Sequence, residues 1–369
     1  MSLPKIPAEQ KRQRIDQDTP VGRSSVSLKE LAAHLGLSQT TVSRVINKTT
    51  AADRIPQSTQ KRILEAASLL KYEANFFARG LRNKKSFTIG VMVPEISEGY
   101  STAVLSGIED ALLQEGFFYF IVSHRHRPEL LEGYPKLLLS RAVEGIIAVD
   151  TQINQELPVP IIAVSGHKPH EGVVNIQLDH TKAVRLALEH LLTLGHRKIA
   201  FIKGQVFSSD TKLRWKAICD VSSLLGIDID PQLTVQLEGS STGTVSGHAA
   251  ARALLQRNKK FTAIFAFNDL SAIGAIRALS EANLRVPHDV SVVGFDDVLS
   301  ASTNNPGLTT VHQPLREMGG IAASTLLNMI RKTNTPNRLI RVLPTFIVRQ
   351  STCHVKETLR KSQPRVLLG

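Results

Sequence analysis

The stretch LKELAAHLGLSQTTVSRVIN, residues 28–47, predicts two short helices joined by a glycine turn. Gly36 supplies the left-handed backbone that ends the first helix, and Ser38 is a natural N-cap for the second. Apolar side chains recur at the helical spacing on both segments, so the pair forms a hairpin with its own small core. These apolar residues are Leu28, Leu31, Ala32, Leu35, Val42, Val45 and Ile46.

One polar face of the second helix is left pointing outward. Hydrogen-bonding side chains near a helix N-terminus are what a recognition helix offers to base edges in a DNA major groove. We therefore expect DNA contacts from Gln39, Thr40, Ser43, Arg44 and Asn47. A helical hairpin on a larger domain, with a merely solvated polar face, is the alternative that this segment alone leaves open.

The distribution of charge favours the DNA interpretation. Residues 1–85 hold 16 Lys and Arg against 7 Asp and Glu, which is +9 of the chain's net charge of +13. A basic module on a nearly balanced body is typical of proteins that neutralise phosphates. Membrane attachment would need a basic amphipathic helix, which residues 1–24 do not provide.

The N-terminal region divides further. We expect a disordered basic arm over residues 1–24, and a helix-turn-helix domain over 25–73 that is completed by a third helix near 58–70. Residues 74–86 read as a hinge helix and linker. Their motif NFFARGL (75–81) is too short to hold a helix alone in water, so we expect it to fold when a DNA groove receives it.

From Phe87 onward, apolar runs alternate with segments of helical period, as is typical of parallel sheets covered on both faces. One sheet is too small for all of them, so the pattern predicts an α/β core of two doubly wound parallel-sheet subdomains with a ligand cleft between them. The expected strands are 87–93, 117–122, 145–149, 161–164, 198–202, 263–267 and 290–295. The clearest expected helices are 102–115, 181–193, 246–256 and 270–282.

Residues 26–352 resemble the LacI/GalR family of bacterial regulators. The resemblance rests on motifs in collinear order. They are TTVSRVIN (40–47), NFFARGL (75–81), GHRKIAFIKG (195–204), NDLSAIGAIRAL (268–279), LRVPHDVSVVGFDD (284–297) and LTTVHQP (308–314). The resemblance implies a periplasmic-binding-protein-like core over 87–354, followed by a tail over 355–369. One subdomain of the core is expected near 87–178 and 314–340, and the other near 179–313 and 341–354.

The resemblance also implies a homodimer on a pseudo-palindromic operator in double-stranded DNA. Gln39, Thr40 and Arg44 fall on base-reading positions, and Leu81 falls on an apolar lever that wedges into a central base step. The other hinge positions that the resemblance places in the minor groove are Asn75, Ala78 and Arg79.

In the core, Arg214, Asn268 and Asp296 fall on the family's ligand-contacting positions. They suit a small-molecule effector, namely a sugar, a sugar phosphate or a purine. The function implied is a transcriptional regulator, a repressor of a carbohydrate-utilisation operon. Two alternatives without a ligand remain: Asp296 could cap the turn after its strand, and Arg214 could be a surface arginine.

The chain departs from the family pattern in places. Ile55–Pro56 comes about three residues late, so the loop after the recognition helix is long. Between Asp150 and Pro158 there is little room for a crossover helix, and Ser165–Gly166 stands where many members carry an acidic ligand residue. The tail past Cys353 has no leucine heptads, which favours a dimer over a tetramer.

Several classes of protein are not expected. His124–Arg127 reads as a solvated basic loop, with contact to an anionic ligand as the alternative, and no further metal ligands lie nearby in the sequence. Enzyme and nucleotide-binding motifs are missing, so we expect neither catalysis nor a cofactor. A sugar-binding protein of the periplasmic kind would need an export signal, and a nucleotide-dependent α/β enzyme would need a glycine-rich loop. We expect a cytoplasmic protein, without membrane contact and associated with the nucleoid.

Overall fold

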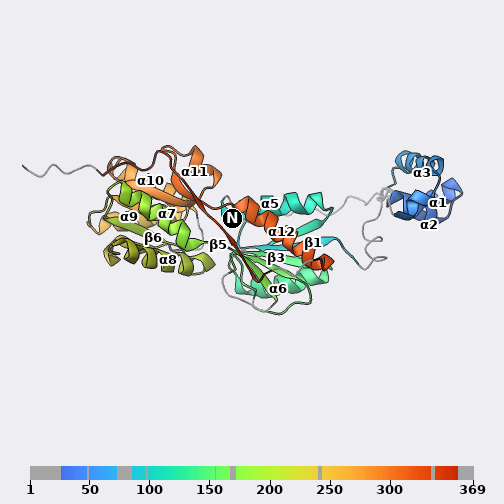
Figure 1. The fold of residues 1–369 in the computed structure, drawn as a ribbon, viewed down its shortest axis with the longest axis horizontal. Coiled ribbons are helices and arrows are strands. Elements are labelled where there is room, and N and C mark those ends of the chain that lie inside the picture. The colour runs from blue at the N-terminus through green and yellow to red at the C-terminus, as the bar shows by residue number, and fades with distance from the viewer. Residues whose placement is uncertain are drawn as a thin grey trace, which may run out of the picture. The chain divides into compact units, whose positions relative to one another are not determined.

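The computed structural model describes residues 26–47, 50–72, 85–96, 99–153, 155–166, 172–239, 243–333 and 337–355 (Figure 1). The chain divides into two compact units, one up to Lys85 and one from Ser86 onward. None of the helices in these ranges is long and apolar enough to cross a membrane.

Within residues 26–72, helices pack around a small apolar core. They are α1 (Leu28–Leu35), α2 (Gln39–Ile46), the short 3-10 helix η1 (Thr50–Arg54) and α3 (Gln57–Leu69). A capping box starts α1, because the Ser27 hydroxyl accepts from the Glu30 amide while the Glu30 carboxylate accepts from the Ser27 amide. Leu31, Val42 and Ile63, one from each α-helix, are fully buried at the centre.

The long loop between α2 and α3 is packed onto this core. Ala52 is buried, and the Gln60 side-chain amide donates to the carbonyls of Ala52 and Ile55 at 3.0 and 2.8 Å. These bonds satisfy two backbone carbonyls of the loop, so its described residues 50–56 add to the core of the domain.

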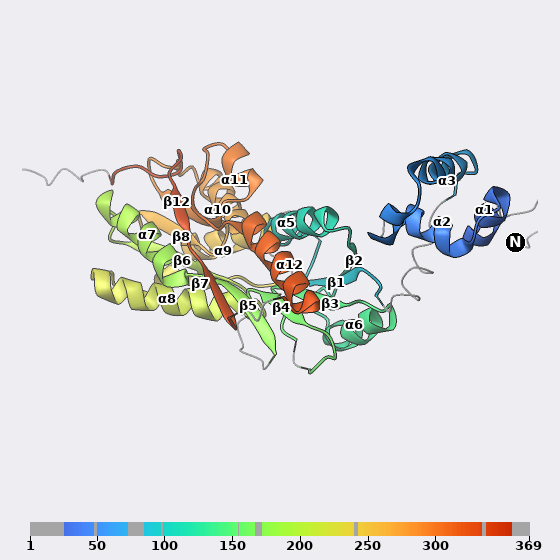
Figure 2. The same ribbon diagram turned by 45° about the vertical axis from the view of Figure 1, so that its right-hand side comes forward.

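The first sheet of the larger unit is parallel throughout, in the order β11-β5-β4-β3-β1-β2. Its strands are β1 (Thr88–Val93), β2 (Phe118–Ser123), β3 (Gly145–Val149), β4 (Ile161–Val164), β5 (Val173–Leu178) and β11 (Leu339–Val342). α5 (Tyr100–Gln114) and α12 (Leu315–Arg331) lie side by side on one face, and α6 (Pro128–Ser140) covers the other (Figure 2). No helix lies in the described residues between β3 and β4, as the short spacing predicts.

The second sheet has the order β12-β10-β9-β8-β6-β7, with β12 antiparallel to β10. Its strands are β6 (Ile199–Lys203), β7 (Thr234–Gln236), β8 (Ala263–Ala266), β9 (Ser291–Asp296), β10 (Thr309–His312) and β12 (Thr345–Ile347). α7 (His180–Thr193) and α8 (Ser209–Leu225) cover one face, and α9 (Thr244–Gln256) and α10 (Asp269–Glu281) cover the other. The short helices η2 (Pro231–Leu233) and α11 (Leu299–Thr303) complete this half.

Among the described residues, three segments cross between the sheets. They connect β5 to α7, β10 to α12, and β11 to β12. The Asp179 amide donates to the Val342 carbonyl at 2.9 Å, which ties the first crossover to the third. The predicted subdomain boundary at residues 340–341 falls inside β11, whose four residues all pair with β5. That strand therefore belongs to the first sheet as a whole.

Candidate nucleic-acid interface and ligand cleft

The start of α2 is fixed by its N-cap. The Ser38 hydroxyl accepts from the Thr41 amide at 3.1 Å and lies 2.9 Å from the Thr41 hydroxyl. This cap holds Gln39 and Thr40 in the first helical turn, where both side chains are exposed, and Arg44 is exposed one turn later. These side chains form the polar surface that the sequence predicts.

The prediction that Ser43 faces outward is wrong. Ser43 is only 8% exposed, because position 43 lies at the edge of the apolar stripe that packs on the core. Asn47 caps the C-terminus of α2 and folds back over Ser43, and its side-chain amide donates to the Ser43 carbonyl at 2.7 Å. Asn47 is half-buried, so the outward surface of α2 is narrower than predicted.

The predicted hinge residues Asn75, Ala78, Arg79 and Leu81 lie outside the described residues. The basic arm over 1–24 and the tail beyond Val355 lie outside them as well. Their predicted roles stay predictions.

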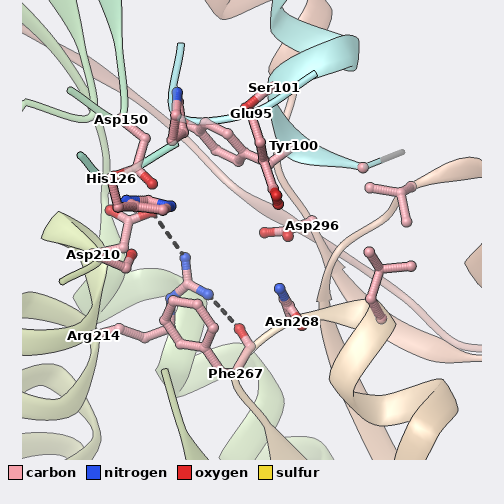
Figure 3. A pocket seen from close by; sticks show the side chains of 15 residues that line it. Glu95, Tyr100, Ser101, His126, Asp150, Asp210, Arg214, Phe267, Asn268 and Asp296 are labelled. Carbon is pink, nitrogen blue, oxygen red and sulfur yellow. Dashed lines mark hydrogen bonds and ion pairs between the residues drawn. The ribbon is translucent and has the colours of Figure 1, made fainter. Parts of the chain in front are cut away.

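The larger unit contains a cleft at the carboxyl ends of strands from both sheets. Glu95 follows β1, Asp150 follows β3, Asn268 follows β8, and Asp296 ends β9. Figure 3 shows these side chains around one space together with Arg214 from α8. The structure thus brings together all three core residues singled out from the sequence, at the place where open α/β sheets bind ligands.

Arg214 is a buried residue of this cleft, with 2% exposure. Its guanidinium lies 3.6 Å from the Phe295 ring centroid and 4.5 Å from that of Phe267. One terminal nitrogen donates to Asp210 at 3.2 Å and the other to the Phe267 carbonyl, whereas Nε has no partner among the described residues. These contacts exclude an ordinary surface arginine and hold the guanidinium in one orientation.

Asn268 both caps a helix and lines the cleft. As the N-cap of α10, its side-chain oxygen accepts from the Ser271 amide at 2.9 Å, within a capping box. Its side chain, 9% exposed, also lines the cleft (Figure 3). The cap fixes the side chain, so the amide is presented to a ligand in a set orientation.

Asp296 faces the same space and is 5% exposed. Burial raises the pKa of its carboxyl to about 7, against the opposing effect of the Arg214 charge and of a 2.6 Å hydrogen bond from Gln313. The expected alternative, a cap on the next turn, is wrong for this residue. The carboxylate that accepts from the Val298 amide, at the start of α11, belongs to Asp269.

The sequence interpretation missed several cleft residues. Asp210 binds Arg214 at the i, i+4 spacing that could have indicated it, and it also lies 3.2 Å from His180. The Tyr100 hydroxyl lies 2.6 Å from that of Ser165, the residue directly after β4. Burial and then the Asp210 charge keep the pKa of Tyr100 well above its usual range.

The two halves of the core also meet directly at the cleft. The Ser209 hydroxyl, at the start of α8, donates to Asp150 at 2.5 Å and contacts the Ser165 carbonyl at 2.8 Å. The His126 and Phe207 rings, one from the loop after β2 and one from the loop after β6, are in contact with centroids 3.9 Å apart and planes tilted by 36°. None of these contacts could be found from local sequence.

The prediction of a solvated loop at His124–Arg127 is wrong for His124. This ring is 2% exposed, accepts from the His126 amide at 3.1 Å and bonds the Thr151 hydroxyl at 2.9 Å. Burial lowers the pKa of His124 to about 4, so the ring is neutral at physiological pH. In the described ranges, no group of three or more His, Cys, Asp or Glu could hold a metal ion.

Comparisons with known proteins agree with this architecture. Residues 27–75 match the family described as bacterial regulatory proteins, lacI family, and residues 188–352 match a periplasmic binding protein-like domain. The transcriptional regulator DegA of Bacillus subtilis (strain 168) is 32% identical over 88% of this chain and 97% of its own length. Both units of the chain are therefore accounted for by one relative.

Solved structures give the same result. The Lac repressor dimer bound to operator and an anti-inducer has a TM-score of 0.80 and 26% identity, over 89% of this chain and all of its own. A complex of the regulator CelR with cellobiose has a TM-score of 0.66 and 28% identity, over 88% of this chain and 99% of its own. With its helix-turn-helix unit, its two-sheet ligand core and these relatives, the chain belongs to the LacI family and is a DNA-binding transcriptional regulator.

Proposed function

We propose that this chain is a homodimeric repressor of a carbohydrate-utilisation operon, acting on nucleoid DNA in the cytoplasm. A sugar held in the cleft controls its affinity for a pseudo-palindromic operator. The observation that carries the proposal is the convergence of Arg214, Asn268 and Asp296 on one buried space between two halves of the core (Figure 3).

The chemistry of the cleft suits a sugar. Adjacent hydroxyls present donors and acceptors that a guanidinium, a carboxamide and a carboxyl can bind together, with charge-assisted bonds as the strong ones. Phe267 supplies an apolar surface beside these polar groups, as small-molecule sites generally do. The cellobiose complex of the relative CelR supports this choice of ligand class.

For DNA, the exposed Gln39, Thr40 and Arg44 are the side chains we assign to base edges. The predicted minor-groove contacts of Asn75, Ala78, Arg79 and Leu81 belong to the same proposal. Asn47 supports the end of the helix by donating to the carbonyl and the hydroxyl of Ser43, and we assign its remaining exposed surface to a DNA contact.

The dimer is supported by an apolar surface on the first sheet. β2 is an edge strand, and its Phe118, Phe120 and Ile121 are 54%, 37% and 38% exposed. Apolar edge strands are rarely left open to water because they invite association. We assign this edge to a second copy of the chain, in keeping with the dimeric Lac repressor structure.

A genomic-fragment binding selection on the full chain tests the function. Bound fragments should share a two-fold symmetric motif, and footprinting should protect two major-groove half-sites. Thermal shifts with cellobiose, D-ribose, glucose 6-phosphate and hypoxanthine then test the ligand class. Recovery of fragments without a shared motif would contradict operator recognition, and stabilisation by hypoxanthine alone would replace the sugar by a purine.

A further inference from the structure

The second crossover is bonded directly to the ligand cleft. Gln313, the residue after β10, is 2% exposed and donates its side-chain amide to Asp296 Oδ1 at 2.6 Å. Its backbone amide also donates to the Asp296 carbonyl at 3.3 Å. A ligand atom that bonds the Asp296 carboxyl therefore acts on a group already tied to the segment that joins the two sheets.

Asp297, the next residue along the chain, forms hydrogen bonds to two other segments of the core. Asp297 Oδ2 accepts from Nδ1 of His312, the last residue of β10, at 2.8 Å. Its Oδ1 accepts from Arg349 at 2.6 Å, and Arg349 follows β12 beyond the third crossover. One carboxylate thus connects the start of the second crossover with the chain that emerges from the third.

The backbone here is held in a conformation that side chains disfavour. Asp296 has φ 114° and Asp297 has φ 60°, and two successive non-glycine residues in this region are uncommon. Such a conformation persists where surrounding contacts fix it, and it is enriched at switch segments. The contacts that fix it are the partners of the two carboxylates together with Asp269, which accepts from the Val298 amide at 2.9 Å.

We propose that Asp297 is a positioning residue that holds the Asp296 carboxyl toward the cleft and links it to the second and third crossovers. This inference rests on the proposed role of Asp296 in ligand binding. Loss of Asp297 should release both crossovers without unfolding either sheet. Ligand occupancy would then no longer be transmitted to the relative opening of the two halves.

Hydrogen exchange of the full chain, followed by mass spectrometry, tests the link without a ligand. In Asp297→Asn, amides of residues 312–316 and 342–345 should exchange about tenfold faster or more, since the side chain loses its charge and one of its two acceptor oxygens, while amides of β6 and β8 keep their rates. Asp289→Asn is the matched control, because Asp289 also binds an arginine through both oxygens, at 2.8 and 2.9 Å, but lies away from the cleft. It should leave the crossover amides unchanged.

His312→Ala provides a second test if Asp297→Asn folds poorly. It removes one partner and keeps the bond between Asp297 and Arg349, so acceleration should be confined to residues 312–316. Unchanged exchange at the crossovers in either folded variant, or faster exchange spread evenly over both sheets, would overturn the positioning role. Neither result depends on DNA, so a failure to find an operator would count against the proposed function alone.

Discussion

Asp296 lies among charges that act in opposite directions. Arg214 stabilises its ionised form, whereas burial and the carboxylates of Asp210 and Asp150 favour the neutral form. A carboxyl poised in this way can accept a hydrogen bond from a ligand hydroxyl or donate one to it. This adaptability suits a site that must recognise a small molecule by its hydroxyl pattern.

The pKa of Asp296 makes a prediction for stability. This pKa rises from the ordinary aspartate value of 3.8 to about 7 in the folded chain, so the folded state holds the proton more tightly than the unfolded state. The Asp296 contribution to the free energy of unfolding therefore falls as the pH rises from about 4 to about 7. Asp296→Asn lacks this titration. The free energy of unfolding of the variant should therefore increase relative to that of the wild type as the pH is raised from about 5 to about 8.

Urea unfolding at the two pH values measures this difference. His124, whose pKa is lowered to about 4, contributes the opposite trend, because its stabilising effect is lost as the pH falls from its unfolded value of 6.5. That contribution is common to both proteins and cancels in the comparison. A pH-independent difference between wild type and variant would show that Asp296 titrates normally.

Arg44 gives a second prediction at this scale. Replacing it with Ala should cost about 1–3 kcal/mol at the operator and relax preference at one base pair per half-site, as loss of a bidentate contact does. Arg277→Ala, an exposed arginine of α10, is the control and should change DNA affinity by less than about 0.5 kcal/mol. Equal losses on operator and random DNA would mean that Arg44 contacts only phosphate.

The sequence predicted the cleft residues to the extent that they sit in collinear motifs. Asn268 and Asp296 lie in two such motifs, Arg214 was placed by the family resemblance of the span between motifs, and the three side chains meet in space as expected. Tyr100 and Phe207 were missed, and their contacts with Ser165 and His126 were not expected, because the two residues of each pair are far apart in the chain and no local sequence pattern links them. Ser43 was misplaced because helical period alone does not fix where a stripe ends.

At the scale of elements, long apolar runs were predicted well and short ones were not. β3, β4 and β8 are continuously apolar, β1, β6 and β9 have apolar interiors with polar residues only at their ends, and all six are fully or nearly fully buried. β7 and β12 have three residues each, and β10 begins with two threonines. These segments become strands through their hydrogen bonds to neighbouring strands, which a local sequence pattern does not show. α8 buries Asp210, Thr211 and Arg214 on its cleft side, which weakens the apolar period that would have indicated it.

The contact between α5 and α12 makes a prediction about packing. A Cβ at Gly107 would lie 1.8 Å from the Arg316 carbonyl oxygen, so Gly107→Ala must push the two helices apart. We expect a loss of about 1–3 kcal/mol in the free energy of unfolding. Gly133→Ala in α6 is the control, because its Cβ would meet nothing within 4 Å and alanine favours the helix by roughly 0.8–1 kcal/mol.

Urea unfolding measures the free energy of unfolding of the two glycine variants and of the wild type. Equal stability of Gly107→Ala and wild type would contradict the close approach of α5 and α12.

The hinge carries the next prediction. Leu81→Ser should weaken operator binding by about tenfold or more, because a polar side chain cannot replace an apolar wedge between base steps. The free energy of unfolding of the core should stay the same, and urea unfolding provides that comparison. Leu224→Ser, at an exposed position of α8, is the control for DNA affinity. Undiminished operator affinity of Leu81→Ser would show that Leu81 does not insert between base steps.

At the scale of the whole molecule, charge and ligand chemistry are divided between the two units. The residues up to Lys85 carry +9 of the net charge of +13, while the cleft with its carboxylates lies in the unit from Ser86 onward. A regulator needs both units to share one conformational equilibrium. Coupling between a cleft ligand and DNA must then be reciprocal, with a typical size of about 1–3 kcal/mol.

The most direct test is fluorescence anisotropy of the full chain on a selected operator, with and without a sugar that stabilises the protein. We expect the sugar to change the operator Kd about 5–150-fold, and Asp296→Ala to abolish this change while its sugar-free Kd stays close to wild type. If a bound sugar left the operator Kd unchanged, or if Asp296→Ala responded to it as the wild type does, ligand control of DNA binding through Asp296 would be ruled out.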